Sequence, residues 1–364
     1  MNLFESLLEP YPFRNEKYGH AQFGWGGGME HTTVSSMGSF GRDLISHELA
    51  HHWFGNKITC GTWKDIWLNE GLTEYMSGLV HEQDGPSNFV TWKNNKITSI
   101  TSQPGGATYL SDAGALSVNT IFSSRLTYNK GAMITHMLRW KMGDMAFFQA
   151  LRNYLNDTNL AYAYAQTNDL KGHLEAVHGS SLSEFFNDWL YMQGYPTYTI
   201  AAQNWGAGQL KITVSQTQSH SSVSYFEMPL EIRLTSAGGV NYDVVIENTF
   251  NNQEFIVAVP FLVDAVTFDP NKHIVSKNNV ITLANESFEL EPTISVYPNP
   301  ANEELHIMMP TTIHLEKVEI YNLLGQLVAT HFSPNFKTNA LVSGIHVLKM
   351  ITSEGIIHKN FIKK

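Results

Sequence analysis

The sequence predicts an α+β protein of several domains, in which a mainly helical part is followed by two parts built of β-strands. Apolar residues recur at helical spacing before Tyr191, the period changes to two after Pro196, and an acidic stretch precedes a last segment. A chain of 364 residues is long enough for two or three domains. We expect a mainly helical domain at 1–196, a β-sandwich at 197–285, a linker at 286–293 and an all-β domain at 294–364.

Composition excludes several classes of protein. The formal net charge of -10 argues against nucleic acid as the partner, because proteins that bind phosphates usually present a basic surface. The sequence holds no uninterrupted apolar run of about eighteen residues, so we expect no membrane span. The one cysteine, Cys60, cannot form an internal disulfide, and we expect it to be a small buried residue.

The segment from Ile45 to Asn56 holds two histidines at helical spacing. His47 and His51 are four residues apart, so on a helix both imidazoles point from the same face and can reach one metal ion. The side chain of Glu48 then points toward a water molecule bound to that ion. This layout is that of a zinc hydrolase, and the alternative is a surface helix with solvated histidines.

The helix that carries these histidines is expected to span 42–56. Ser39 is a possible cap at its start, and Gly55 is a stop signal at its end. His52 lies about 100° round the helix from His51. We therefore expect His52 to have a packing or surface role and not to bind metal.

A zinc site needs a third protein ligand from another part of the chain. Eighteen residues separate His51 from Glu70, and a set of two histidines and a glutamate leaves the fourth position open for water. We expect His47, His51 and Glu70 to hold one Zn²⁺ ion per chain. On a helix over 69–81, Glu74 shares a face with Glu70 and could orient a ligand histidine, with a solvated glutamate as the alternative.

A glycine-rich segment, Gly24 to His31, precedes the histidine motif. A glycine run suits an extended segment whose backbone comes close to a peptide, because no side chain blocks the approach. Taken alone, the segment is a flexible turn with one solvated glutamate. Beside a metal site, the Glu30 carboxylate can pair with a free α-ammonium, so that only peptides with a free N-terminus are cut productively.

The remaining chain gives a coarse secondary-structure prediction. We expect a loop-rich stretch over 86–124, and an apolar helix that opens at Tyr128-Asn129-Lys130-Gly131. Apolar and polar residues alternate from Phe226 to Leu234, which is typical of a half-buried strand. Further strands are expected at 242–246, 255–259 and 265–268.

Three separated motifs together resemble the aminopeptidase N family of zinc metallopeptidases over roughly residues 8 to 290. They are Gly27-Gly28-Met29-Glu30, then His47-Glu48-x-x-His51 with Trp53-Phe54-Gly55-Asn56, then Trp67-Leu68-Asn69-Glu70-Gly71. The resemblance implies a thermolysin-like, mainly helical catalytic domain and zinc-dependent release of N-terminal residues from peptides. It also implies a β-rich domain before the glycine segment in a longer protein.

The resemblance assigns roles to individual residues. Glu48 is the general base, and Tyr128 of the Tyr-x-Lys-Gly segment donates its hydroxyl to the oxyanion. Glu30 holds the free end of the peptide, together with Gly27, Gly28 and Met29. Family members usually have asparagine after that glutamate, and this chain has His31 there.

The last seventy or so residues are similar to the C-terminal sorting domain of proteins exported by the type IX secretion system of gram-negative bacteria. The likeness rests on Val296 to Asn302, Val318 to Gly325, and Leu341 to Ile345 with the basic end of the chain. It implies an Ig-like all-β fold, the type IX machinery as a partner, and a protein that is secreted or held at the cell surface. An ordinary all-β accessory module is the alternative.

Two other functions fit the same residues. An endopeptidase with the same zinc site would also cleave peptides whose N-terminus is blocked. A surface fragment that binds peptides without activity would not hydrolyse them at all. An assay with free and blocked peptides separates these alternatives from an aminopeptidase.

Overall fold

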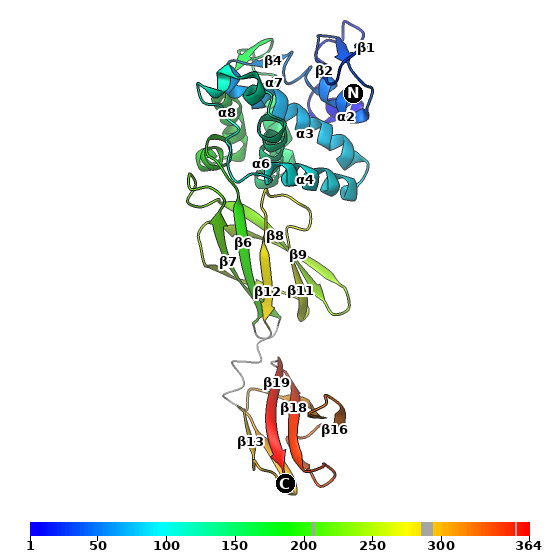
Figure 1. Ribbon diagram of the computed structural model, residues 1–364, viewed down its shortest axis with the longest axis vertical. Helices are drawn as coiled ribbons and strands as arrows, with labels where there is room; N and C mark the ends of the chain where they lie inside the picture. Colours follow the sequence, from blue (N-terminus) through cyan, green and yellow to red (C-terminus); the bar gives the residue numbers. More distant parts are fainter. Residues whose placement is uncertain (206–207, 285–293, 354) are drawn as a thin grey trace.

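The computed structural model describes residues 1–205, 208–284, 294–353 and 355–364. Figure 1 shows a helical part, then a part built of two sheets, then a β-rich tail at the C-terminus. The linker expected at 286–293 lies outside the described residues. The principal helices are α1 (Asn2–Leu7), α2 (Arg42–Ala50), α3 (Trp67–Gln83), α4 (Pro86–Ile100), α5 (Val118–Ile121), α6 (Gly131–Met142), α7 (Asp144–Leu155), α8 (Thr167–His178) and α9 (Ser183–Phe185).

Helix α3 is the central element of the helical part. It packs against α2 on one side and against α4 and α6 on others (Figure 1). All but one of its first thirteen residues are buried, because neighbouring helices cover most of its circumference. At its crossing with α6, a Cβ on Gly71 would lie 2.9 Å from the Gly131 Cα, so the two backbones are in contact.

The helix of the histidine motif is shorter than its expected span of 42–56. α2 begins after Gly41, and no side chain caps it, so the prediction that Ser39 caps this helix was wrong. It ends at Ala50, after which tighter turns carry the chain to Phe54. His51 keeps helical dihedrals at the end of the helix, so the spacing of the two histidines is preserved.

The prediction of a loop-rich stretch over 86–124 was wrong in its first half. Helix α4 fills it, and Pro86 stands at its first turn, where the missing N–H has no cost. Its buried residues recur every three or four positions, but many polar residues lie between them, which concealed the helical period. The buried residues are Phe89, Trp92, Lys93, Ile97 and Ile100.

Two short sheets lie beside these helices. β3 (Val34–Met37) runs parallel to β1 (Gly19–Gln22) and antiparallel to β2 (Gly28–Met29). β4 (Ile58–Cys60) pairs in parallel with β5 (Ala163–Ala165). The first sheet therefore holds Gly28 and Met29 of the glycine segment in an extended conformation next to α2, whereas residues 24–27 form a bend.

The part that follows consists of two antiparallel-rich sheets with a shared core. Their strand orders are β10-β7-β6-β12 and β11-β8-β9. Strands were expected at four of these places, and β8, β9, β10 and β11 confirm them. The bounds are β6 (Pro196–Asn204), β7 (Gln209–Gln218), β8 (Met228–Ser236), β9 (Asn241–Asn248), β10 (Gln253–Ala258), β11 (Val263–Phe268) and β12 (Val280–Ala284).

The helical part and these sheets share one hydrophobic core. The ring centroids of Trp189 and Phe226 lie 4.5 Å apart, and the Trp140 indole N–H donates to the Pro229 carbonyl at 2.8 Å. This packing covers strand β8 on both faces. Glu231, expected on a solvated face, is buried, and its carboxylate accepts a hydrogen bond from the Asn271 side chain at 2.7 Å.

The tail has a separate core between two sheets, whose strand orders are β13-β14-β17 and β16-β15-β18-β19. Within the described residues, no helix is both long and apolar enough to cross a bilayer. The strands of the tail are β13 (Ser295–Tyr297), β14 (Glu304–Met308), β15 (Leu315–Asn322), β16 (Leu327–His331), β17 (Asn335–Lys337), β18 (Gly344–Thr352) and β19 (Gly355–Lys363).

The contact between Gly71 and Gly131 generates a stability prediction. Gly131→Ala places a methyl group against the α3 backbone, which cannot move aside cheaply, so we expect a loss of about 1–3 kcal/mol. Thermal and denaturant unfolding followed by far-UV circular dichroism measures it. The matched control is Gly172→Ala in α8, where a Cβ meets nothing within 4 Å, and this change should stabilise the helix by about 0.5–1 kcal/mol. Equal stability of the two variants would contradict the proposed close contact.

Candidate metal centre and cleft

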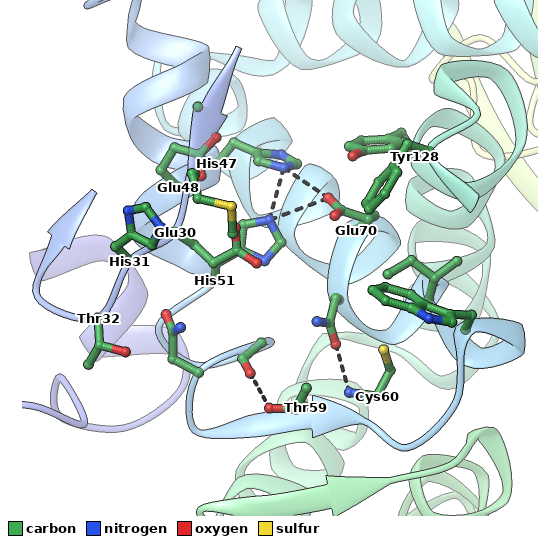
Figure 2. Close-up of a pocket in the computed structure, with 18 of the residues that line it drawn as sticks. Glu30, His31, Thr32, His47, Glu48, His51, Thr59, Cys60, Glu70 and Tyr128 are labelled. Carbon is green, nitrogen blue, oxygen red and sulfur yellow. Dashed lines mark hydrogen bonds and ion pairs between the residues drawn. The ribbon is translucent and has the colours of Figure 1, made fainter. Parts of the chain in front are cut away.

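The donor atoms of His47, His51 and Glu70 converge on one point. The two histidines come from α2 and the glutamate from the first turn of α3, as Figure 2 shows. The two Nε2 atoms lie 3.1 Å apart, and Glu70 Oε2 lies 3.2 Å from Nε2 of His47 and 3.3 Å from Nε2 of His51. Ligands about 2.0–2.1 Å from a tetrahedral zinc ion are about 3.3 Å from one another, so this donor set fits zinc.

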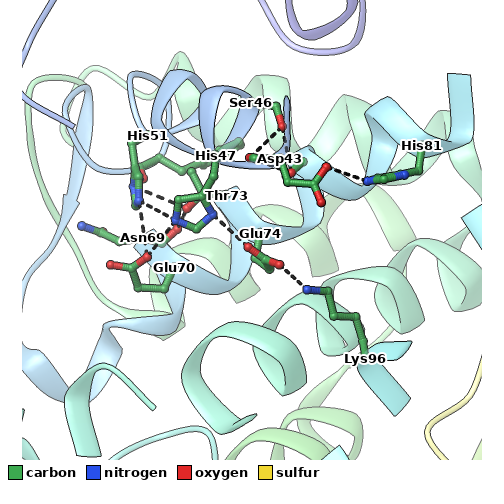
Figure 3. Close-up of polar contacts among 12 residues, drawn as sticks. Asp43, Ser46, His47, His51, Asn69, Glu70, Thr73, Glu74, His81 and Lys96 are labelled. Atoms are coloured by element: carbon green, nitrogen blue, oxygen red, sulfur yellow. Dashed lines mark hydrogen bonds and ion pairs between the residues drawn. The ribbon is translucent and has the colours of Figure 1, made fainter. Parts of the chain in front are cut away.

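Hydrogen bonds at the far side of each imidazole aim its Nε2 at that point. His47 Nδ1 faces Glu74 Oε2 at 2.9 Å, and His51 Nδ1 faces the Phe54 carbonyl oxygen at 3.1 Å. Both partners can only accept, so each Nδ1 carries the proton. Figure 3 shows Glu74 between His47 and Lys96, whose ammonium pairs with its second oxygen. The Nε2 lone pairs are therefore free for a cation.

The electrostatics of the cluster also favour a cation. Burial acts to lower the pKa of His47, but the hydrogen bonds to Glu70 and Glu74 outweigh it and raise the pKa to about 10. Burial acts to raise the pKa of Glu74, but His47 and Lys96 lower it to about 2. Without a metal, the carboxylates thus hold an extra proton on the imidazole, and a metal ion would replace that proton.

Glu48 lies beside this cluster, and its environment explains the glycine at position 28. A Cβ built on Gly28 would stand 2.2 Å from Glu48 Oε1, so only glycine allows β2 to approach the carboxylate. Burial raises the pKa of Glu48 to about 7. A carboxyl group with such a pKa can accept and return a proton near neutral pH.

Glu30 follows β2 and brings a second carboxylate to the same place. One carboxylate oxygen each of Glu30 and Glu48 and one ring nitrogen of His51 all lie within 4.8 Å of one another. Two carboxylates so close together favour a positively charged ligand between them. His31 stands where members of the resembled family usually have asparagine. It is exposed, and its Nδ1 lies 3.0 Å from the Ser36 hydroxyl.

Tyr128 stands over the metal cluster from a π-helical turn, Ser124–Lys130, that precedes α6. Its ring stacks on the His47 imidazole, with 5.8 Å between centroids and 16° between planes. Burial, reinforced by the Glu70 charge, raises the pKa of the phenol well above its ordinary value. The hydroxyl therefore stays protonated and can donate a hydrogen bond.

These residues line one cleft of about 850 Å³, seen in Figure 2. Gly28, Met29 and Glu30 lie along it, with His47, Glu48, His51, Glu70 and Tyr128. Gly27 is not among the lining residues, but its carbonyl accepts the Gly38 N–H at 2.9 Å and so supports the strand that carries Gly28. The structure therefore brings the predicted site residues other than Gly27 together in one cleft.

Several parts of this cleft were missed in the sequence. Trp63 and Phe122 face each other with ring centroids 6.2 Å apart and form an apolar wall, but neither carries a motif signal. The Phe54 carbonyl group belongs to the backbone, so the residue type at this position does not indicate its role. Cys60, which was expected to be a buried residue, is only half-buried and lines the cleft, and burial raises the pKa of its thiol to about 12.

His52 has the packing role that its position on the helix predicted. It is fully buried among Tyr11, Phe13 and Tyr18, with ring centroids 5.1–5.8 Å away. Its Nε2 accepts the Thr33 N–H at 3.1 Å, and its other nitrogen contacts the α2 backbone. It thereby ties the N-terminal segment to the motif helix.

Two family models match the chain. Residues 30–189 match the peptidase family M1 domain, and residues 295–364 match a secretion system C-terminal sorting domain. The first match contains Glu30, Glu48, Tyr128 and the three metal-facing residues. The second covers the β-rich tail.

Curated relatives cover the same helical part. The chain is 32% identical over 164 residues to leucyl aminopeptidase of Saccharolobus solfataricus, and 33% identical over 160 residues to aminopeptidase N of Lactococcus lactis. These matches cover 44% and 42% of this chain but only 21% and 19% of those proteins. The chain thus matches about a fifth of the length of these relatives.

One solved structure is similar in fold over a larger part of the chain. Aminopeptidase A of Legionella pneumophila, in complex with aspartic acid, matches with a TM-score of 0.55 at 14% sequence identity. The match covers 72% of this chain and 31% of that chain. The likeness of fold therefore extends beyond the 160 residues that the M1 domain model covers.

The Glu74 contact generates a prediction about metal affinity. Glu74→Ala removes the acceptor that orients His47, so zinc should bind about 10–100-fold more weakly, as measured by competition with a chromogenic chelator. Glu74→Gln keeps an acceptor oxygen and should therefore lose less zinc affinity than Glu74→Ala. Glu247→Ala, at an exposed position in β9, removes one negative charge away from the site and is the control. Unchanged affinity in Glu74→Ala would show that the hydrogen bond does not orient the ligand.

Proposed function

We propose that this chain, which carries a peptidase family M1 domain and a secretion system C-terminal sorting domain, belongs to an exported zinc-dependent aminopeptidase. The observation that carries the proposal is the convergence of three donor atoms, 3.1–3.3 Å apart, in a cleft that also holds two further carboxylates. His47, His51 and Glu70 would hold one zinc ion. When bound, zinc acts as a Lewis acid on the scissile carbonyl and lowers the pKa of water.

The chain's own residues supply the proton transfers. The Glu48 carboxylate takes a proton from the attacking water and returns it to the nitrogen of the leaving amine. Burial of Glu48 in the cleft acts to raise its pKa, which favours its uptake of the proton. The Tyr128 hydroxyl donates a hydrogen bond to the carbonyl oxygen as negative charge develops there.

The glycine segment binds the peptide's free end. Glu30 pairs with the α-ammonium through a charge-assisted hydrogen bond, which fixes the first peptide bond beside Glu48. Gly28 and Met29 form β2, a terminal strand of its sheet, so the backbone on its open side can pair with an extended peptide. Gly27 and Gly28 keep this approach clear of side chains.

We extend the proposal to the fold and the export of the parent protein. Residues 1–196 would form a thermolysin-like catalytic domain, 197–285 a supporting β-sandwich, and 294–364 an Ig-like tail after a linker at 286–293. The sorting-domain match supports export, and we assign it to the type IX machinery of a gram-negative bacterium. The protein would then act in the medium or at the cell surface.

Removal of the proposed base tests the mechanism. Glu48→Ala should lower kcat for an aminoacyl-amide substrate by at least about 100-fold, because general-base catalysis typically contributes about 10²–10⁴. Metal analysis should still give one zinc per chain, since Glu48 is not a ligand. Glu16→Ala, at an exposed position, is the control. Full turnover by Glu48→Ala would rule out its role as base.

The selectivity for a free N-terminus tests Glu30. The wild type should cleave a peptide with a free amine far faster than its N-acetylated form, as measured by kcat/KM for both. Glu30→Gln should reduce that preference by about 10–100-fold, because a hydrogen bond to a charged group is worth about 1.5–3 kcal/mol. Equal cleavage of both peptides by the wild type would indicate the endopeptidase alternative instead.

A further inference from the structure

The tail carries an apolar groove that takes no part in the proposed peptidase chemistry. It encloses about 460 Å³ between the β15–β16 turn and the segment that leads into β18. Leu324 is 84% exposed, Val342 80% and Leu323 70%, and none of the lining residues is Asp, Glu, Lys or Arg. Apolar side chains gathered at a surface in this way mark an interaction site. The large apolar lining residues are Leu323, Leu324, Val328, Leu341, Val342 and Ile345.

The groove adjoins an open strand edge. β16 is the terminal strand of its sheet, and its five residues, Leu327–His331, include no lysine, arginine or carboxylate. Val328, the extra residue of a bulge against β15, lines the groove. A free edge without charged residues is a template for pairing with another strand.

The opposite edge of the same sheet is closed. The Ala301 N–H donates to the Ile362 carbonyl at 2.7 Å, and the Lys364 N–H donates to the Ala301 carbonyl at 2.9 Å. The Asn299 side chain accepts the Ile362 N–H at 2.9 Å. The chain thus covers β19 with its own residues, whereas within the described residues β16 has only β15 as a strand partner.

We propose that the groove and the β16 edge bind an extended, uncharged polypeptide segment of the export machinery. Its backbone pairs with β16, and its apolar side chains enter the groove. The inference rests on the proposed sorting function of the tail, since the sorting-domain match makes a protein of the export machinery the expected reader of residues 295–364. A second copy of this chain would be the rival occupant.

Export of the full chain from the bacterium that makes it tests the proposal. The double variant Leu324→Glu, Val342→Glu places charge in the groove at two exposed positions, and we expect the amount outside the cell to fall at least tenfold. Met308→Glu, which charges an exposed apolar residue of the other sheet, should be exported like the wild type. Circular dichroism of each purified chain checks the fold, and the milder Leu324→Ser decides the matter if the double variant is misfolded.

Deletion of residues 294–364 separates the sorting function of the tail from the role of the groove. If the deleted chain is exported normally, the sorting function itself is wrong. If deletion stops export while the charged groove does not, the groove proposal alone is overturned. Sedimentation of the purified chain covers the rival occupant, because self-association that the groove variant abolishes, with export unchanged, would assign the groove to a second copy.

Discussion

The packing of α2 against α3 is the constraint on which the metal centre depends. The hydroxyls of Ser46 and Ser77 lie 2.8 Å apart between the two helices, both buried, and such small side chains allow the close approach. Gly71 brings the backbone of α3 into contact with that of α6 on its other side. With three helices fixed in this way, rigid backbone holds the ligand residues in place, and the hydrogen bonds of His47 and His51 then orient the donor atoms.

The structure brings together the three donor residues that the sequence predicted, because their spacing in the chain is local. The histidine pair is four residues apart on one helix, and the position of Glu70 follows from a short connection, so spacing alone brings the donors together. The same holds for Glu74, one turn after Glu70. The secondary structure around them was predicted less well, as α4 shows, where a polar-rich face concealed the helical period.

The parts that the sequence did not predict depend on contacts between distant segments. The contact of Gly28 with Glu48 joins a strand to a helix, and no pattern of residues records it. The alternating pattern of β8 suggested that Glu231 faces solvent. That pattern does not reveal the segment around Asn271, which covers the second face of the strand. Lys96 reaches Glu74 from α4, a helix that was not predicted at all.

The separation of the two cores also has a consequence for removal of the tail. Within the described residues, the core of the tail contains no side chain of the core that the helices share with the two sheets that follow them. Cleavage of the chain between the two parts would therefore leave the packing of each core intact.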